Sequence, residues 1–180
     1  MKQAVVKCDI CGGYYVAQMA ADGSPVFCCS NTPRCSSTKS VCEFVLAYIR
    51  QYGINVYRWG AHCWNCCEIT PIYTYRLIRD LAWVSPFFNS FPEVMLGTLP
   101  SVDAFFIEHF DSVKGVGKAG RAVNTCIYCG AQQGQVFRIN DHALFLKQQR
   151  ARHANFCMGN IVYPDTAWIE NDIKAIFDCS

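Results

Sequence analysis

The sequence predicts an α+β protein of two small domains, residues 1–52 and 53–180. Cysteines recur in pairs spaced as Cys-x-x-Cys, strand-like stretches flank these pairs, and longer stretches have helical periodicity. With 180 residues, of which 52% are hydrophobic and 14% aromatic, the chain can bury a core and is not a disordered tail. The expected architecture is a small cysteine-rich ribbon followed by a larger antiparallel β domain with flanking helices.

Cysteine is the outstanding residue type, with 13 in the chain. The odd number, the repeated spacing and a start at residues 1–7 that is too short and charged for an export signal favour free thiolates in a reducing cytoplasm over a disulfide-rich secreted domain. Two pairs of thiolates complete the tetrahedron that Zn²⁺ prefers. The sequence therefore predicts two zinc ions per chain.

The first cysteine pair lies in a predicted hairpin. Cys8-Asp9-Ile10-Cys11-Gly12-Gly13 has the composition of a zinc knuckle, because glycine adopts the left-handed turn that follows such a pair. A strand over 14–19, a turn at Asp22-Gly23 and a return strand from Pro25 lead to the cysteines of 28–35. Ser40 and Glu43 then form a capping box for an amphipathic helix that ends at Gly53.

The stretch Phe27-Cys28-Cys29-Ser30-Asn31-Thr32-Pro33-Arg34-Cys35, together with the preceding Cys-x-x-Cys-Gly, resembles the four-cysteine zinc ribbon of bacterial type IA topoisomerases. The resemblance covers residues 8–40. It implies that Cys8, Cys11, Cys29 and Cys35 are the ligands and that Cys28 is a spare thiol. It also implies contact with DNA, mostly single-stranded. Thr32 departs from the family, which usually has an aromatic residue there.

The second domain contains Cys63 and Cys66, and later Cys126 and Cys129, each pair between strand-like segments. We expect the four thiolates to hold one zinc ion, with strands at 54–59, 69–75, 121–125 and 135–137. These residues also resemble a group of uncharacterised bacterial proteins with paired zinc knuckles. The matching residues, which support the metal site and imply no activity, are Cys63, Trp64, Cys66, Thr70, Pro71, Asn124, Cys126, Cys129, Gly130, Ala131, Gln133 and Gly134.

Two groups of residues are candidates for contact with nucleic acid. In the ribbon, basic side chains suit phosphates and Tyr14, Tyr15 or Phe27 suits base stacking, although for any single aromatic residue the ribbon's own core is the favoured assignment. In the second domain, the glycine-rich basic loop 114–121 suits phosphates, and the alternative is a solvated loop. Residues 114–152 carry seven basic side chains and one acidic one. The candidates are Lys7, Tyr15, Arg34, Lys39, Lys114, Lys118 and Arg121.

Catalysis and membrane insertion are not expected. Loop 115–122 lacks the Lys-Ser/Thr end of a nucleotide-binding P-loop, and His109-Phe110-Asp111 has Asp where a zinc deaminase needs Glu. His153 and Cys157 leave a Cys/His active site open. No apolar run reaches the roughly 18 residues of a membrane span.

The preferred hypothesis is an accessory or regulatory zinc protein that binds nucleic acid, most simply DNA, either single- or double-stranded. The alternative is an adaptor in a larger protein complex, which would dock through the aromatic segment 83–110 while zinc has a purely structural role. The formal net charge of only +2 argues against a uniformly basic surface and makes a local patch necessary for the preferred hypothesis.

Overall fold

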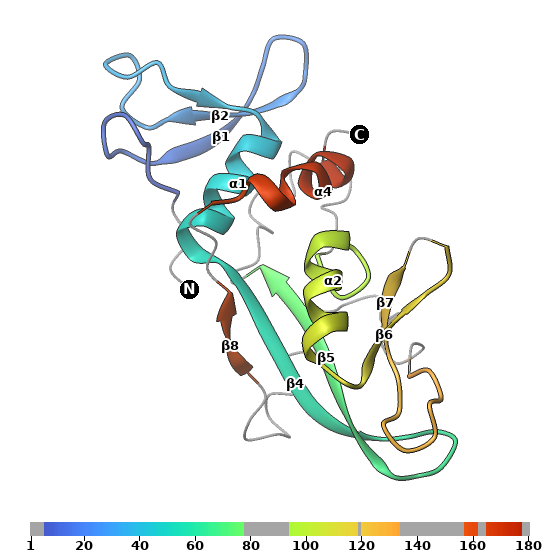
Figure 1. The fold of residues 1–180 in the computed structure, drawn as a ribbon. Helices are drawn as coiled ribbons and strands as arrows, with labels where there is room; N and C mark the ends of the chain where they lie inside the picture. Colours follow the sequence, from blue (N-terminus) through green and yellow to red (C-terminus); the bar gives the residue numbers. More distant parts are fainter. Residues whose placement is uncertain (1–5, 78–93, 119, 134–156, 162–164, 178–180) are drawn as a thin grey trace. The chain divides into compact units, whose positions relative to one another are not determined.

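Residues 6–77, 94–118, 120–133, 157–161 and 165–177 are described by the computed structural model (Figure 1). The chain divides into two units. The first combines residues 1–53 and 77–93 with 162–180, and the second combines residues 54–76 with 94–161. The sequence placed all of 53–180 in one domain, whereas the contacts assign the C-terminal helix to the first unit.

A three-stranded antiparallel sheet forms the ribbon of the first unit. Its strands are β1 (Tyr15–Met19), β2 (Pro25–Cys29) and β3 (Thr38–Lys39), in the order β1-β2-β3. The turn between β1 and β2 forms because Asp22 accepts hydrogen bonds from both the backbone N–H and the hydroxyl of Ser24, and Gly23 adopts a φ of 82°. Tyr15 and Phe27 lie buried on the inner face of this sheet.

Helix α1 (Val41–Tyr52) covers that inner face. Its predicted capping box is present, since Ser40 Oγ accepts from Glu43 N at 3.3 Å and Glu43 Oε2 accepts from Ser40 N at 2.7 Å. The rings of Phe27 and Phe44 stack at 3.8 Å between centroids. The predicted helix boundaries are therefore confirmed, including the end at Gly53, whose φ is 74°.

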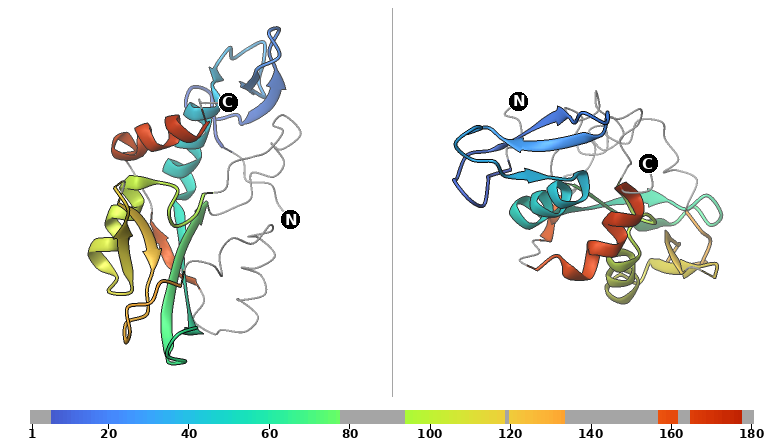
Figure 2. Two further views of the ribbon diagram at one scale, coloured as in Figure 1. Left: turned by 90° about the vertical axis from the view of Figure 1, so that its right-hand side faces the viewer. Right: turned by 90° about the horizontal axis from the view of Figure 1, so that it is seen from above.

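Helix α4 (Ala167–Phe177) packs beside α1, as both views of Figure 2 show. Asp165 caps its start by accepting from Ala167 N at 2.9 Å. Ile169, Ile173 and Phe177 form its buried stripe, and Ile176 is half-buried. Arg50 of α1 donates to the hydroxyl of Thr166 at 2.9 Å, which links the two helices at their ends.

The second unit is built on a long hairpin. Strands β4 (Ile54–His62) and β5 (Ile69–Leu77) run side by side, and the turn between them carries Cys63 and Cys66 (Figure 1). Strand β8 (Cys157–Ile161) pairs antiparallel with β4 and was not predicted from the sequence. The predicted strand 135–137 lies outside the described residues.

Helix α2 (Pro100–His109) and the hairpin of β6 (Val113–Val116) and β7 (Arg121–Asn124) complete the described part of this unit. The core contains Tyr75, Leu99 and Phe106, all fully buried. The buried Asp103 ties the start of α2 in place, because its Oδ1 accepts from the Tyr75 hydroxyl and from Gly97 N, both at 2.9 Å.

The helices and small antiparallel sheets of both units confirm the predicted α+β mixture. Among the described residues, no helix is both long and apolar enough to cross a membrane.

Candidate metal centres

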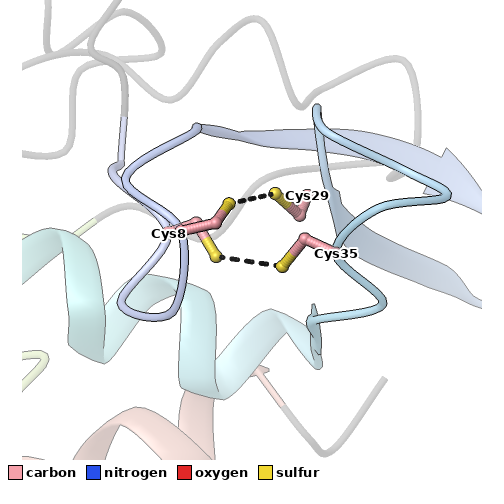
Figure 3. Close-up of side chains that lie close together, drawn as sticks. Cys8, Cys29 and Cys35 are labelled. Atoms are coloured by element: carbon pink, nitrogen blue, oxygen red, sulfur yellow. Dashed lines mark hydrogen bonds between the residues drawn. The ribbon is translucent and has the colours of Figure 1, made fainter.

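Cys8, Cys11, Cys29 and Cys35 converge in the first unit, with their four sulfurs within 4.8 Å of one another. The first two come from the turn before β1, Cys29 ends β2, and Cys35 lies in the loop to β3. Figure 3 shows the sulfurs of Cys8, Cys29 and Cys35 facing one another across the space between turn and hairpin. We name these four residues the first centre.

Cys63, Cys66, Cys126 and Cys129 form an equivalent group in the second unit, which we name the second centre. One pair lies in the β4–β5 turn and the other directly follows β7. The predicted partnership between two Cys-x-x-Cys pairs that are 60 residues apart or more is therefore present.

The sulfur separations fit a tetrahedral zinc ion. Cys11–Cys29 and Cys8–Cys35 are 3.4 and 3.8 Å apart in the first centre, and both cross pairs of the second are 3.6 Å apart. Zn–S bonds of about 2.3 Å place tetrahedral sulfurs about 3.8 Å apart, whereas a disulfide needs about 2.05 Å. All eight thiols are free, so the two groups fit two zinc ions per chain.

The surroundings shift the pKa values of the thiols in the first centre in opposite directions. Backbone N–H groups, chiefly that of Cys11, lower the pKa of Cys8 to about 6 against the effect of burial. At Cys29 the N–H of Asn31 acts in the same direction, but burial and the neighbouring thiols raise the pKa to about 12. A metal ion that balances their charge would favour ionisation of all four thiols together.

Each of the three Cys-x-x-Cys pairs lies in the same kind of tight turn, which ends at a residue with positive φ. Gly12, Cys67 and Gly130 have φ values of 72°, 63° and 74°, and each donates its N–H to the carbonyl of the first cysteine of its pair. Cys67 is the exception in chemistry, because a side chain there strains the left-handed turn that glycine adopts freely.

An asparagine two residues after a cysteine supports each centre. Asn31 donates its backbone N–H to Cys29 Sγ at 3.4 Å and its side-chain amide to Cys11 Sγ at 3.3 Å. Asn65 repeats the arrangement, with its backbone N–H on Cys63 Sγ at 3.4 Å and its amide on Cys129 Sγ at 3.6 Å. Each asparagine thus joins the two cysteine pairs of its centre. Sequence reasoning missed both, although the repeated Cys-x-Asn pattern could have revealed them.

Gln133 makes the most buried of these contacts in the second centre. Its amide donates to Cys63 Sγ at 3.3 Å and to the carbonyl of Ala131 at 2.8 Å. Such donors fix the orientation of a thiolate and offset its charge.

Side chains of β5 and β7 position the second pair of cysteines. The side chain of Asn124 bonds to the backbone of Tyr73 as the backbone of a neighbouring strand would. Its Oδ1 accepts from Tyr73 N and its Nδ2 donates to Tyr73 O, both at 2.8 Å. The hydroxyl of Thr70 accepts from Ile127 N at 3.2 Å. These bonds bring the end of β7 against β5 and hence against the first pair.

The structure contradicts a base-stacking role for Tyr15. Its side chain is only 3% exposed, and its hydroxyl donates to Asp9 and contacts the hydroxyl of Ser37, each at 2.7 Å. The alternative assignment, the ribbon's own core, holds for Tyr15 and for Phe27, which is buried against α1.

Lys39 also has a structural contact. Its ammonium lies 3.1 Å from Asp9 and 5.2 Å from the centre of the Tyr15 ring. The positive charge of Lys39 is thus partly offset by Asp9 and is less available to a phosphate. Lys7 and Arg34 are exposed.

The basic side chains of the β6–β7 hairpin are exposed as expected. Lys114 and Arg121 share one face, because Lys114 lies opposite Val123 and Val116 lies opposite Arg121. Lys118 lies in the turn between the strands. Arg121 also packs across Gly97, where an added Cβ would lie 2.7 Å from its Nε.

The described residues of the other candidate sites make local contacts. His62 Nδ1 contacts the carbonyl of Cys67 and His109 Nδ1 that of Phe105, both at 2.9 Å. In the aromatic segment, Phe106 is buried and Phe105 stacks on His109, while residues 83–93 lie outside the described part of the chain. His153 also lies outside it. Four thiolate ligands close a zinc site and leave no position for a reacting water.

Comparisons with models of protein families, with curated proteins and with solved structures find no match to this chain.

Proposed function

We propose that this protein binds nucleic acid, with DNA as the first candidate, and that its zinc ions hold the binding surfaces in shape. The observation that carries the proposal is the chemistry of the outer face of the β1-β2-β3 sheet. That face carries one basic, one aromatic and one amide side chain (Lys7, Tyr14 and Gln18) beside apolar ones and, among the described residues, no acidic one. A nucleic-acid strand needs this combination, because phosphates require cations and unpaired bases require exposed rings.

The register identifies the residues of this outer face. Tyr15 and Phe27 face inward, so Tyr14, Val16 and Gln18 face outward with the opposed Val26 and Cys28. Lys7 lies opposite Tyr14 in an isolated bridge and shares its side of the sheet. Tyr14 is 49% exposed, so its ring, unlike that of Tyr15, is available for stacking.

A second basic surface, the β6–β7 hairpin, supports the same function. Lys114, Lys118 and Arg121 project from one short hairpin. Local surfaces are needed, because eight thiolates and two Zn²⁺ ions change the formal charge of the chain from +2 to −2. A protein of net negative charge binds phosphates only where its cations are concentrated.

The test is fluorescence anisotropy with a labelled 20-mer of thymidine and a 20-base-pair duplex, over a range of salt concentrations. Binding should weaken as salt rises, and Lys7→Gln or Lys118→Gln should each reduce the slope of log Kd against log salt by about 0.7–0.9. Lys174→Gln is the matched control, because this lysine of α4 is paired with Glu170. Absence of binding to either DNA, or to the corresponding RNAs, at 50 mM salt would refute the proposal.

Tyr14→Ala separates stacking from charge. It should weaken binding to the single strand about 5- to 50-fold, from the worth of about 1–3 kcal/mol per stacked base, and leave the salt slope unchanged. An equal loss for the duplex would contradict the assignment of Tyr14 to unpaired bases.

The alternative function, a protein–protein adaptor, has support from a different place than the sequence indicated. In the described part of segment 83–110, Phe106 is core and Phe105 stacks on its own helix. Exposed apolar side chains gather instead at the second centre.

A further inference from the structure

Four exposed apolar side chains flank the second centre. Trp64 is 70% exposed, Tyr128 63%, Ile69 59% and Ile127 48%. Trp64 follows one ligand pair's first cysteine, and Ile127 and Tyr128 lie between the cysteines of the other. We name these four residues the knuckle-tip surface. Large apolar side chains grouped in the open in this way mark a contact site.

The surface is held rigid by the fold. The indole N–H of Trp64 donates to the carbonyl of Gln132 at 2.7 Å, which fixes the ring across the opposite cysteine pair. Ile127 is held beside Ile69, because its N–H donates to the hydroxyl of Thr70, the next residue along β5. Since the only polar atom of Trp64 already has a partner, its exposed ring offers apolar and cation–π contact alone.

The charge around the knuckle-tip surface is negative. Segments 59–75 and 122–133, which contain these four side chains, include Glu68 and no Lys or Arg, and Arg58, Arg76 and Arg121 lie just outside them. Asp111 is also close, because its neighbour Ser112 accepts through its carbonyl from both the N–H and the hydroxyl of Thr125. A zinc ion with four thiolates adds two further negative charges. Phosphates are repelled here, so nucleic acid does not suit this surface.

We propose that the knuckle-tip surface binds a basic, apolar segment of a partner protein. The apolar side chains of the partner segment cover Ile69 and Ile127. The Lys or Arg side chains of that segment lie over the rings of Trp64 and Tyr128, where they also offset the charge of the thiolates and Glu68. The knuckle-tip surface shares no residue with the surfaces proposed for nucleic acid.

The experiment is selection from a random peptide library displayed on phage, with the full zinc-loaded chain as target. Enriched peptides should combine aliphatic or aromatic residues with a net positive charge. A synthetic copy of the most enriched peptide, labelled for anisotropy, should bind at least tenfold more weakly to Trp64→Ala and to Tyr128→Ala, and more weakly to Glu68→Lys. Both aromatic variants should retain two zinc ions by native mass spectrometry. Tyr128→Ala provides an independent readout if Trp64→Ala loses zinc, because it removes an exposed ring and keeps the backbone N–H that donates to Cys126 Sγ at 3.4 Å.

Tyr14→Ala is the matched control, since it removes an exposed tyrosine from the other unit. It should leave peptide binding unchanged, whereas Trp64→Ala and Tyr128→Ala should leave DNA binding unchanged. Any of four results would overturn the proposal. These are no enrichment relative to the Tyr128→Ala protein, enrichment of acidic peptides, loss of DNA binding in Trp64→Ala, or a dimer in sedimentation that Trp64→Ala abolishes, which would assign the surface to a second copy of the chain.

Discussion

Replacing Gln133 by alanine should weaken zinc binding at the second centre more than any other single change outside the eight cysteines that we consider. The amide of Gln133 is 3% exposed and donates to the 1% exposed Cys63. A hydrogen bond to a charged group is worth about 1.5–3 kcal/mol, and 1.4 kcal/mol corresponds to a factor of about ten. The expected loss is therefore about 10- to 100-fold, the range found for residues that support metal ligands.

Asn65→Ala should cost less at the same centre. Its side-chain amide is exposed and lies 3.6 Å from Cys129, so water can replace it, and its backbone N–H still reaches Cys63. We expect a loss of about two- to fivefold, from a net hydrogen-bond worth of about 0.5–1 kcal/mol. Gln132→Ala is the matched control, because only the backbone carbonyl of that residue is used, by Trp64.

The assay is competition with a chromophoric zinc chelator, with Co²⁺ substitution to follow the thiolate absorption of each centre. Losses in the order Gln133, Asn65, Gln132 are expected, with the first centre unaffected. Equal affinities for Gln133→Ala and Gln132→Ala, within a factor of about three, would refute the inference that buried donors stabilise the thiolates.

Three further changes test other parts of the structure. Cys67→Gly should raise the free energy of unfolding by about 1 kcal/mol, because φ is 63° at this position. Cys67→Ala should not raise it. Chemical denaturation measures both variants, and an equal gain would assign the effect to loss of the thiol and not to the turn. Asn124→Ala should lower the free energy of unfolding by about 2–4 kcal/mol, because two backbone groups of Tyr73 lose their partner. Val123→Ala, on the other face of β7, should lower it by less than half as much. Equal losses would contradict the role of Asn124 as a partner of the Tyr73 backbone. Burial raises the pKa of Asp103. In the wild type, its carboxyl therefore binds a proton more readily in the folded state than in the unfolded state. Its contribution to stability falls as pH rises from about 4 towards the raised pKa. Asp103→Asn should remove that slope, and the difference in unfolding free energy between the two proteins, measured from pH 4.5 to 8, should change in that direction; a flat difference would show that burial does not govern this carboxyl.

Local patterns in the sequence predicted the ribbon well. The capping box at Ser40 and Glu43, the turn at Asp22-Gly23 and the stop at Gly53 depend on interactions within a few residues, and all three are present. The two ligand groups were predictable for a related reason, since the spacing of a cysteine pair is a local property and only four-cysteine groups complete a tetrahedron.

Contacts between distant residues could not be predicted in this way. Strand β8 carries no periodicity of its own that distinguishes it, and it is defined by pairing with β4 about 100 residues earlier. Tyr14 and Tyr15 are adjacent and chemically identical. Which ring is exposed depends on which face of the sheet packs against α1, because successive residues of a strand point to opposite faces. The sequence offered both rings for stacking on bases, and the structure buries Tyr15 and exposes Tyr14. Periodicity did not distinguish Gln133 from Gln132 either, and only the resemblance to the paired-knuckle proteins singled out Gln133.

The account depends most on two separate four-cysteine zinc centres, one in each unit. Native mass spectrometry of the full chain tests this directly, with Cys29→Ser and Cys129→Ser as single-site variants. The account predicts two zinc ions in the wild type and one in each variant, with the amide NMR signals of the other unit unchanged. One zinc ion in the wild type, or loss of both ions on changing either cysteine, would contradict it.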